Sequence, residues 1–492
     1  MEAIIRFVYI LSTSEGEAMK FDIKTLVKIV IPALIGFAIA MVPPPEGLET
    51  AAMIYMGIFA CSIIWLVLDV ISDYVVVIIA MSAFVVFNVA DLTTAFAPFA
   101  QSTVWLVIGA FAISGVIAKT GLLKRMAFHI LKLFPENFRG QITALFATGF
   151  IMSPMIPSLT AKGAILAPFA SSAAKALGYK KGSKAASGMF CAAWITAGIL
   201  GCAFLSGAVP VYTILGFLDV EAQAQWTWVH WFLAACVWLV VITVLSYLFI
   251  VFWYNPKKEA AQADGEEVAL EKGFAKRQLA ELGPMSRDEK VAGGLLALAL
   301  LGWIFGSMIG LSSTIVALLV MALMAITGVM DKKDFATRIS WTTVVFVGGV
   351  FSLAAMITKL GIDVWLAGIL GPIVGPLAGN PYLFVAVICI ATYLMRVVII
   401  SQTATTAIFF AALGGICIAS GVDPWVLLFT CYMSTLVWHF SFSNTTYVAA
   451  IGSTNGEMVE HKDTQPMNIA YMAINLIACV ASVPLWQLMG MC

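Results

Sequence analysis

Apolar runs separated by short polar stretches make up most of the chain. Eleven of these runs are long enough to cross a bilayer as helices, which takes about 20 residues each. They fall near residues 25–43, 51–70, 72–90, 103–119, 184–204, 228–252, 291–309, 313–329, 341–358, 424–440 and 468–489. The pattern predicts an all-α polytopic membrane protein with about 11 transmembrane helices.

Two further apolar runs, 141–172 and 381–413, are interrupted by hydroxyl-bearing residues. The first interruption reads SLTAK at 158–162, and the second reads SQTATT at 401–406. Backbone groups in lipid must be paired within the protein, so a helix breaks there only where the freed groups meet a ligand, an ion or water. We therefore predict two re-entrant hairpins whose tips lie at these interruptions.

The chain contains two copies of this arrangement. The segment that starts at 103 (TVWLVIGAFAISGVIAKTG) recurs 240 residues later, at 343, as TVVFVGGVFSLAAMITKLG. A second pair of polar interruptions, at 206–210 and 441–446, is spaced by about 236 residues. An odd number of spans between the copies gives them opposite orientations. Duplicated, interrupted hydrophobic segments predict inverted repeats of a transporter, with the binding site near the bilayer midplane.

We expect scaffold and transport regions on either side of a charged linker. The expected regions are 1–102 (N-terminal scaffold helices), 103–225 (first-repeat transport region with hairpin 141–172), 226–254 (scaffold helix), 255–290 (cytoplasmic linker), 291–340 (second-repeat scaffold helices), 341–460 (second-repeat transport region with hairpin 381–413) and 461–492 (C-terminal scaffold helix).

Composition and charge support a membrane protein and predict its orientation. Of the 492 residues, 61% are hydrophobic and 11% are charged, and the mean hydropathy is +0.99, whereas soluble proteins carry about 25% charged residues. The net charge is zero, so nothing indicates a nucleic-acid partner. With the N-terminus in the cytoplasm, the outer loops 44–50, 91–102, 216–226 and 360–380 contain no Lys or Arg. This positive-inside pattern predicts a multi-pass protein of the cell (inner) membrane with its C-terminus outside.

The hairpin tips carry the groups that an anion site needs. The second helix of each hairpin starts at the tip, so its free N–H groups and the positive end of its dipole face the midplane. Ser158, Thr160, Ser401 and Thr403 add hydroxyl donors. Carbonyl groups freed at the tips and at 206–210 and 441–446 could coordinate a cation such as sodium. The alternative is that these Ser and Thr residues only cap helices.

Three basic residues lie beside the interruptions. Intramembrane cations usually face a partner or a cavity, so Lys162 is a candidate counter-charge for an anionic substrate, with a structurally paired lysine as the alternative. Arg396 is expected to pair with backbone carbonyls, and His439 either senses substrate protonation or is a hydrogen-bonded structural histidine. Every Asp and Glu lies in a loop or at a span end, which disfavours a proton relay and a cationic substrate.

The enzyme motifs that such a chain could carry are missing from the sequence. It contains no His-Glu-x-x-His, no paired intramembrane aspartates, no Walker loop and no Gly-x-Ser-x-Gly. We therefore expect a transporter and not an enzyme.

At the tips and at 104–111 (VWLVIGAF) and 119–122 (KTGL), the chain resembles the divalent anion:sodium symporter family of the ion transporter superfamily. Members carry Ser-Asn-Thr at both tips, where this chain has Leu159 and Gln402 in place of Asn. The continuation to Lys162 is similar to the citrate and 2-oxoglutarate/malate exchanger branch, with Lys for Arg. The resemblance implies a homodimeric elevator transporter in the lipid bilayer. It also implies di- or tricarboxylates or sulfate as substrates.

The resemblance also implies the residues of the site. Substrate binding is expected at Ser158, Leu159, Thr160, Lys162, Ser401, Gln402, Thr403, Gly207, Pro210, Asn444 and Thr445. Sodium, the one cofactor we consider, would be held by Ser158, Ser401, Gln402, Ser206 and Ser443, partly through backbone carbonyls. The Leu159 side chain cannot donate a hydrogen bond, so we predict either one weakened cation site or a sodium-independent exchanger in which Lys162 supplies the ion's charge.

Two other functions are considered. One is a sulfate- or arsenite-type oxyanion permease, which would transport without competition from carboxylates. The other is a non-transporting membrane sensor, suggested by the loss of both tip asparagines and disfavoured by the retained Ser and Thr residues.

Overall fold

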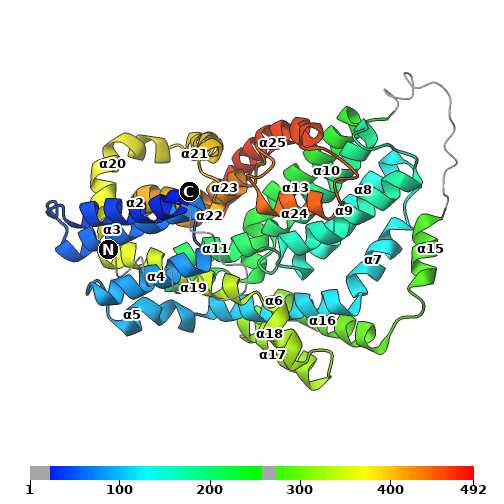
Figure 1. Ribbon diagram of the computed structural model, residues 1–492, viewed down its shortest axis with the longest axis horizontal. Coiled ribbons are helices and arrows are strands. Elements are labelled where there is room, and N and C mark those ends of the chain that lie inside the picture. Colours follow the sequence, from blue (N-terminus) through cyan, green and yellow to red (C-terminus); the bar gives the residue numbers. More distant parts are fainter. Residues whose placement is uncertain (1–22, 257–272) are drawn as a thin grey trace.

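The computed structural model describes residues 23–256 and 273–492, and within these ranges the chain forms helices and no strands. The start of the expected N-terminal scaffold region, 1–22, and the middle of the linker, 257–272, lie outside the described residues. An all-helical polytopic fold is confirmed (Figure 1). Nine helices of the described ranges are long and apolar enough to cross a membrane, and four apolar helices are shorter.

Every apolar run that was predicted to span the membrane contains a helix. These helices are α2 (Ile23–Ala40), α3 (Thr50–Leu68), α4 (Asp73–Val86), α6 (Ser102–Thr120), α10 (Lys184–Gly198), α13 (Trp228–Trp253), α16 (Arg287–Phe305), α17 (Ser313–Ile326), α19 (Trp341–Lys359), α23 (Pro424–Thr435) and α25 (His461–Leu488). The connecting helices are α5 (Leu92–Phe96), α7 (Leu122–Leu131), α12 (Val220–Gln225), α15 (Phe274–Glu281), α18 (Lys332–Arg338) and α20 (Ile362–Ala378).

Each predicted hairpin is a pair of helices joined by a short non-helical link. The first hairpin consists of α8 (Phe138–Met152) and α9 (Leu159–Ala176), with the 3-10 turn η2 (Ser153–Met155) before the link. The second consists of α21 (Pro381–Val398) and α22 (Gln402–Ala419). Ser158 caps α9 and Ser401 caps α22, because the side-chain oxygen of each accepts a hydrogen bond from the backbone N–H three residues on.

Two spans are broken, as the second pair of polar interruptions predicted. In the first repeat, α10 is followed by the 3-10 turn η3 (Leu200–Ala203) and then by α11 (Val209–Phe217). In the second repeat, the chain leaves the helix after α23 and resumes it at α24 (Thr445–Gly452). Pro210 lies at the start of α11, where the missing N–H of a proline costs no helical hydrogen bond.

The long helices α13 and α25 pack against each other and against the hairpins and broken helices (Figure 1). Asn475 of α25 joins them: it accepts from Trp238 of α13 at 2.9 Å and donates to Tyr393 of α21 and Ser434 of α23 at 3.0 and 3.1 Å. By contrast, α6 packs along α17 and α16, and α19 packs along α4. The helices α13 and α25, which correspond to the expected regions 226–254 and 461–492, are thus packing neighbours of the hairpins and broken helices.

Ion pairs tie the two repeats together at the C-terminal end of α6. Asp334 of α18 accepts hydrogen bonds from Lys119 at 2.5 Å and from Arg338 at 2.7 Å. Burial raises the pKa of the Asp334 carboxyl, but these hydrogen bonds outweigh burial and hold the pKa at about 2. Nearby, buried Arg125 of α7 pairs with buried Glu289 of α16 at 2.7 Å. Because Asp334, Arg125 and Glu289 are buried, a substitution that removes the partner of one of them leaves a buried charge unpaired.

Replacing the Asp334 carboxylate should destabilise the protein in a pH-dependent way. Asp334→Asn should lower the free energy of unfolding near neutral pH by about 1–3 kcal/mol. An unfolded Asp has a pKa of about 3.9, so a folded-state pKa near 2 stabilises the protein above that value, and this stabilisation is lost as the pH falls from about 4 toward 2. The unfolding midpoint of both proteins in detergent, measured from neutral pH down to pH ~3, tests this expectation.

The exposed pair Lys175–Glu457 provides the control, because its atoms are as close, at 2.6 Å, but its side chains are more than half exposed. Glu457→Gln should change the midpoint little, since exposed ion pairs contribute about 0–1 kcal/mol. Equal effects of the two substitutions, or an Asp334→Asn effect independent of pH, would contradict the expectation.

Candidate functional site

At the first tip, a buried lysine binds a carbonyl of the first break. Lys162 lies in the first turn of α9, is 0% exposed, and donates from Nζ to the carbonyl of Gly207 at 2.9 Å. A Cβ on Gly201 would collide with Lys162 Nζ. The lysine is therefore enclosed by the break, and glycine at 201 leaves room for it.

Further hydrogen bonds fix the first break to the first hairpin. Ser206 donates to the Pro154 carbonyl at 2.7 Å and accepts from Trp228 Nε1 at 3.0 Å. The N–H of Val209 donates to the Pro157 carbonyl at 3.0 Å. The hydroxyl of Ser206 is thus already engaged by protein groups.

At the second tip, a buried arginine has the corresponding role. Arg396 is 1% exposed and lies in the last turn of α21. Its guanidinium donates to the Ser443 carbonyl at 2.5 Å, to the Ile399 carbonyl at 2.7 Å and also to the Ile400 carbonyl. This agrees with the expectation that Arg396 pairs with backbone carbonyls.

The two acceptor carbonyls occupy equivalent places in the repeats. Gly207 and Ser443 are 236 residues apart, which is the spacing of the two breaks. Each carbonyl accepts from a buried cation of the adjacent hairpin. The lysine comes from the helix after the first tip, whereas the arginine comes from the helix before the second. In each repeat, a basic side chain thus binds the equivalent freed carbonyl, but the two side chains come from different helices of their hairpins.

Amide side chains complete the second tip. Gln402 donates from Nε2 to the Thr435 carbonyl at 3.3 Å, at the end of α23. Asn444 donates to the Leu436 carbonyl at 3.1 Å and accepts from the Tyr447 N–H at 3.1 Å, which caps α24. The helices α22 and α24 therefore both begin at this tip.

A polar cavity of about 380 Å³ lies at the second tip. The tip and the second break form one wall with Ser401, Gln402, Thr403, Ser443, Asn444 and Thr445. The α3–α4 link forms a second wall with the two carboxylates Asp69 and Asp73, and Leu66, Ile71, Ser72, Phe346 and Ile400 complete the lining. Among the described residues, the cavity thus brings together six that the sequence singled out.

The first tip reaches this region through α24. The hydroxyls of Thr160 and Thr446 are 3.5 Å apart, and Thr446 follows the cavity residue Thr445. Ser158 and Leu159 do not line the cavity, and the Leu159 side chain is buried. Gly207 and Ser206 are buried in the first break, and Pro210 starts α11. Only the second tip opens into the cavity.

His439 lies behind the second break, against α25. Its Nδ1 is 3.3 Å from Asn468 Nδ2, and its carbonyl is 3.2 Å from His461 Nε2. His439 does not line the cavity. This position agrees with the alternative that His439 is a hydrogen-bonded structural histidine. It gives His439 no direct contact with a substrate in the cavity.

Sequence reasoning missed Asp69 and Asp73. Both residues lie at span ends, which agrees with the expectation for every Asp and Glu of the chain. The hydropathy pattern does not indicate which span ends lie beside a hairpin tip. The one local signal is the brevity of α4, which has 14 residues and so starts within reach of the membrane interior.

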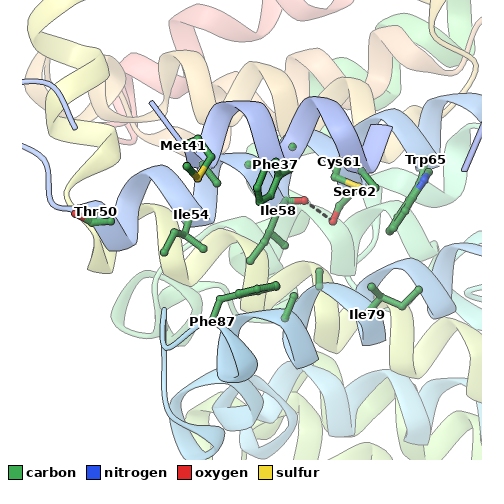
Figure 2. A pocket seen from close by; sticks show the side chains of 16 residues that line it. Phe37, Met41, Thr50, Ile54, Ile58, Cys61, Ser62, Trp65, Ile79 and Phe87 are labelled. Carbon is green, nitrogen blue, oxygen red and sulfur yellow. Dashed lines mark hydrogen bonds between the residues drawn. The ribbon is translucent and has the colours of Figure 1, made fainter. Parts of the chain in front are cut away.

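A larger cavity, of about 520 Å³, has a different chemical character (Figure 2). It lies between α2, α3 and α4 and is lined mostly by hydrocarbon, including Phe37, Met41 and Trp65. Ser62, one of its few polar residues, donates to the Ile58 carbonyl of its own helix at 2.8 Å. A charged or polar solute finds no counter-charge among these lining residues, so the smaller polar cavity is the candidate site.

Comparisons with known proteins agree with a transport role. "Inner membrane protein YbhI" of Escherichia coli K12 is 30% identical over 355 residues, 70% of this chain and 72% of that protein. "Dicarboxylate transporter 1, chloroplastic" of Arabidopsis thaliana is 26% identical over 412 residues, 82% of this chain and 72% of that protein. The structure of the Alcanivorax borkumensis YdaH transporter is similar in fold, with a TM-score of 0.55 at 16% identity, over 95% of this chain and 97% of that one.

The family described as "Sodium:sulfate symporter transmembrane region" matches residues 23–490, almost the whole chain. The protein is therefore a member of the sodium:sulfate symporter family, a family of transporters and not of enzymes.

Proposed function

We propose that the protein exchanges small dicarboxylates across the inner membrane by an elevator mechanism and does so without sodium. The observation that carries the proposal is the fully buried Lys162, whose Nζ lies 2.9 Å from the Gly207 carbonyl. The dicarboxylate transporter among its relatives supports the substrate class. Homodimerisation and a C-terminus outside the cell belong to the same proposal and rest on the family resemblance and the loop charges.

The cavity suits the carboxylates of such a substrate. The N-termini of α22 and α24 both face it, and helix N-termini favour anions through free N–H groups and the helix dipole. Hydroxyls of Ser401 and Thr403 supply additional donors. A second carboxylate of the substrate would lie toward Thr446 and Thr160, where α24 meets the first tip. We propose that Ser158, Leu159 and Pro210 support the site without contacting the substrate.

Fixed cations provide the charge that sodium would otherwise bring. Carbonyls freed at a break are typical sodium ligands, yet Gly207 and Ser443 already accept from Lys162 and Arg396. The hydroxyl of Ser206, another candidate sodium ligand, is also engaged. Both breaks thus have a positive charge beside them without a bound ion, which favours exchange over sodium symport.

Fixed charges also account for exchange in place of net uptake. A sodium ion leaves with the substrate, so the empty site of a symporter returns uncharged. Lys162 and Arg396 cannot leave, and moving uncompensated charges through the low-dielectric membrane interior is costly. The return step would therefore be fast only with another anion bound.

The packing suggests which helices move together. The hairpins, the broken helices, α13 and α25 share extensive contacts, and Asn475 links three of these helices. We propose that they form the mobile unit and that α2–α6 and α16–α19 form the scaffold. This proposal differs from the division expected from sequence, which placed 226–254 and 461–492 in the scaffold and placed α6 and α19 in the transport regions 103–225 and 341–460.

Sulfate is a second candidate substrate, favoured by the description of the matching family. The same helix N-termini would bind it, although a cavity of about 380 Å³ is large for a single tetrahedral anion. Sulfate competition in the assay below distinguishes the two substrates.

Purified protein in liposomes loaded with 2-oxoglutarate, malate or succinate should take up labelled dicarboxylate. Uptake should require the internal anion, because the mobile unit crosses back slowly when no anion is bound. Uptake should also be unchanged by a sodium gradient. The initial rate is measured with and without internal anion and with sodium or choline outside. Uptake that requires sodium would contradict the exchange proposal, and uptake of sulfate alone would replace dicarboxylate with the oxyanion.

Removing the first fixed cation should reduce exchange strongly. Lys162→Met should lower the exchange rate at least tenfold or make it depend on sodium, because the Gly207 carbonyl becomes free for an ion. Lys162→Arg keeps the charge and should retain part of the activity, and Lys175→Met, at an exposed position, should be neutral. Exchange rates are compared for samples that stay monodisperse in detergent. Unchanged, sodium-independent exchange by Lys162→Met would refute the role of Lys162.

A further inference from the structure

The two walls of the polar cavity carry opposite charge. Of the described residues that line it, only Asp69 and Asp73 are charged, and both lie on the α3–α4 link. The wall formed by the tip and the second break holds the N-termini of α22 and α24, and Arg396 binds the carbonyl of the lining residue Ile400. An anion in this cavity is attracted by one wall and repelled by the other.

The two walls also belong to different packing groups. The tip residues are part of α22, which packs mainly on α20 and α23, and of the second break, where the N–H of Trp438 donates to Asn468 of α25. Asp69 caps the C-terminal end of α3 in a left-handed conformation, and Asp73 is the first residue of α4, which packs on α19. If the helices of the tip slide past α3 and α4, Asp69 and Asp73 lie next to the tip only when the tip is near its present position.

We propose that Asp69 and Asp73 act as release acids. They weaken substrate binding on the membrane face where the cavity meets the α3–α4 link, so the site has a lower affinity for dianions on that face than on the other. This inference rests on the proposed dicarboxylate exchange. It adds that the affinity for the substrate differs between the two faces of the membrane. By the predicted topology, the face is the cytoplasmic one.

The arrangement of the neighbouring charges favours repulsion over a cation site. The guanidinium of Arg396 donates to the carbonyls of Ile399, Ile400 and Ser443, and no ion pair of the described residues joins it to the two acids. Asp73 accepts a hydrogen bond from the N–H of Tyr74 at 2.9 Å, within its own helix. Both acidic residues are exposed and both line the cavity, so an anion in the cavity lies close to two carboxyl groups.

The test is the double variant Asp69→Asn, Asp73→Asn, which removes both charges and nearly preserves side-chain shape. Exchange is measured in proteoliposomes whose orientation is fixed by access to a C-terminal tag, with labelled succinate varied on one face at a time. The half-saturating concentration should fall about threefold to tenfold on the α3–α4 face, should stay constant on the other face, and the difference should shrink at high ionic strength.

A matched control is Glu49→Gln, which removes an exposed acid at the opposite end of α3. It should leave the affinity on the α3–α4 face unchanged. Weaker binding by the double variant would mean that the acids hold a cation and would overturn the proposal, as would no change or an equal change on both faces. Absence of exchange by the unaltered protein would instead reject the proposed function and this inference together.

Discussion

The structure depends on pairing the backbone carbonyls that its broken helices set free inside the membrane. An unpaired carbonyl in hydrocarbon costs several kcal/mol, so a break can persist only with a partner at hand. Lys162 and Arg396 are those partners, and each binds the carbonyl at the equivalent place of its repeat. The hairpin tips can therefore be short and polar, with Ser158 and Ser401 capping the helices that follow. The shape of the candidate site is a consequence of this pairing.

Fixed cations have a further consequence for the surrounding packing. Two basic side chains beside the breaks require a rigid environment, because a displaced Lys162 or Arg396 would lose its hydrogen bonds to the freed carbonyls. Asn475 and Trp238 connect α25 and α13 to the hairpin and break helices through hydrogen bonds of 2.9–3.1 Å. The polar residues of these long helices thus hold the hairpins in register, which explains why α13 and α25 pack with the hairpins and not with the outer helices.

The sequence predicted the spans, hairpin tips and breaks well, but it predicted less well which residues contact one another across them. Hydropathy locates spans because each span must be apolar on its own, and Ser-x-Thr marks the tips because a helix N-terminus needs a cap within three residues. Asp69 and Asp73 escaped notice because their relation to Ser401 spans more than 300 residues of sequence. The alternatives for Lys162 could not be separated from the sequence either, since its partner Gly207 lies on another helix. The repeat offset predicted which carbonyls are equivalent but not which side chains bind them.

The two cations differ in their relation to the helix dipole, and this difference makes the repeats unequal. Arg396 lies in the last turn of α21, where the negative end of the dipole favours a cation. Lys162 lies in the first turn of α9, where the positive end opposes one, so its burial there is stabilised chiefly by the Gly207 carbonyl. An anion that approaches the first tip would meet the lysine charge and the helix N-terminus acting in the same direction. The first repeat therefore gains more from a bound anion than the second, even though the cavity opens at the second tip.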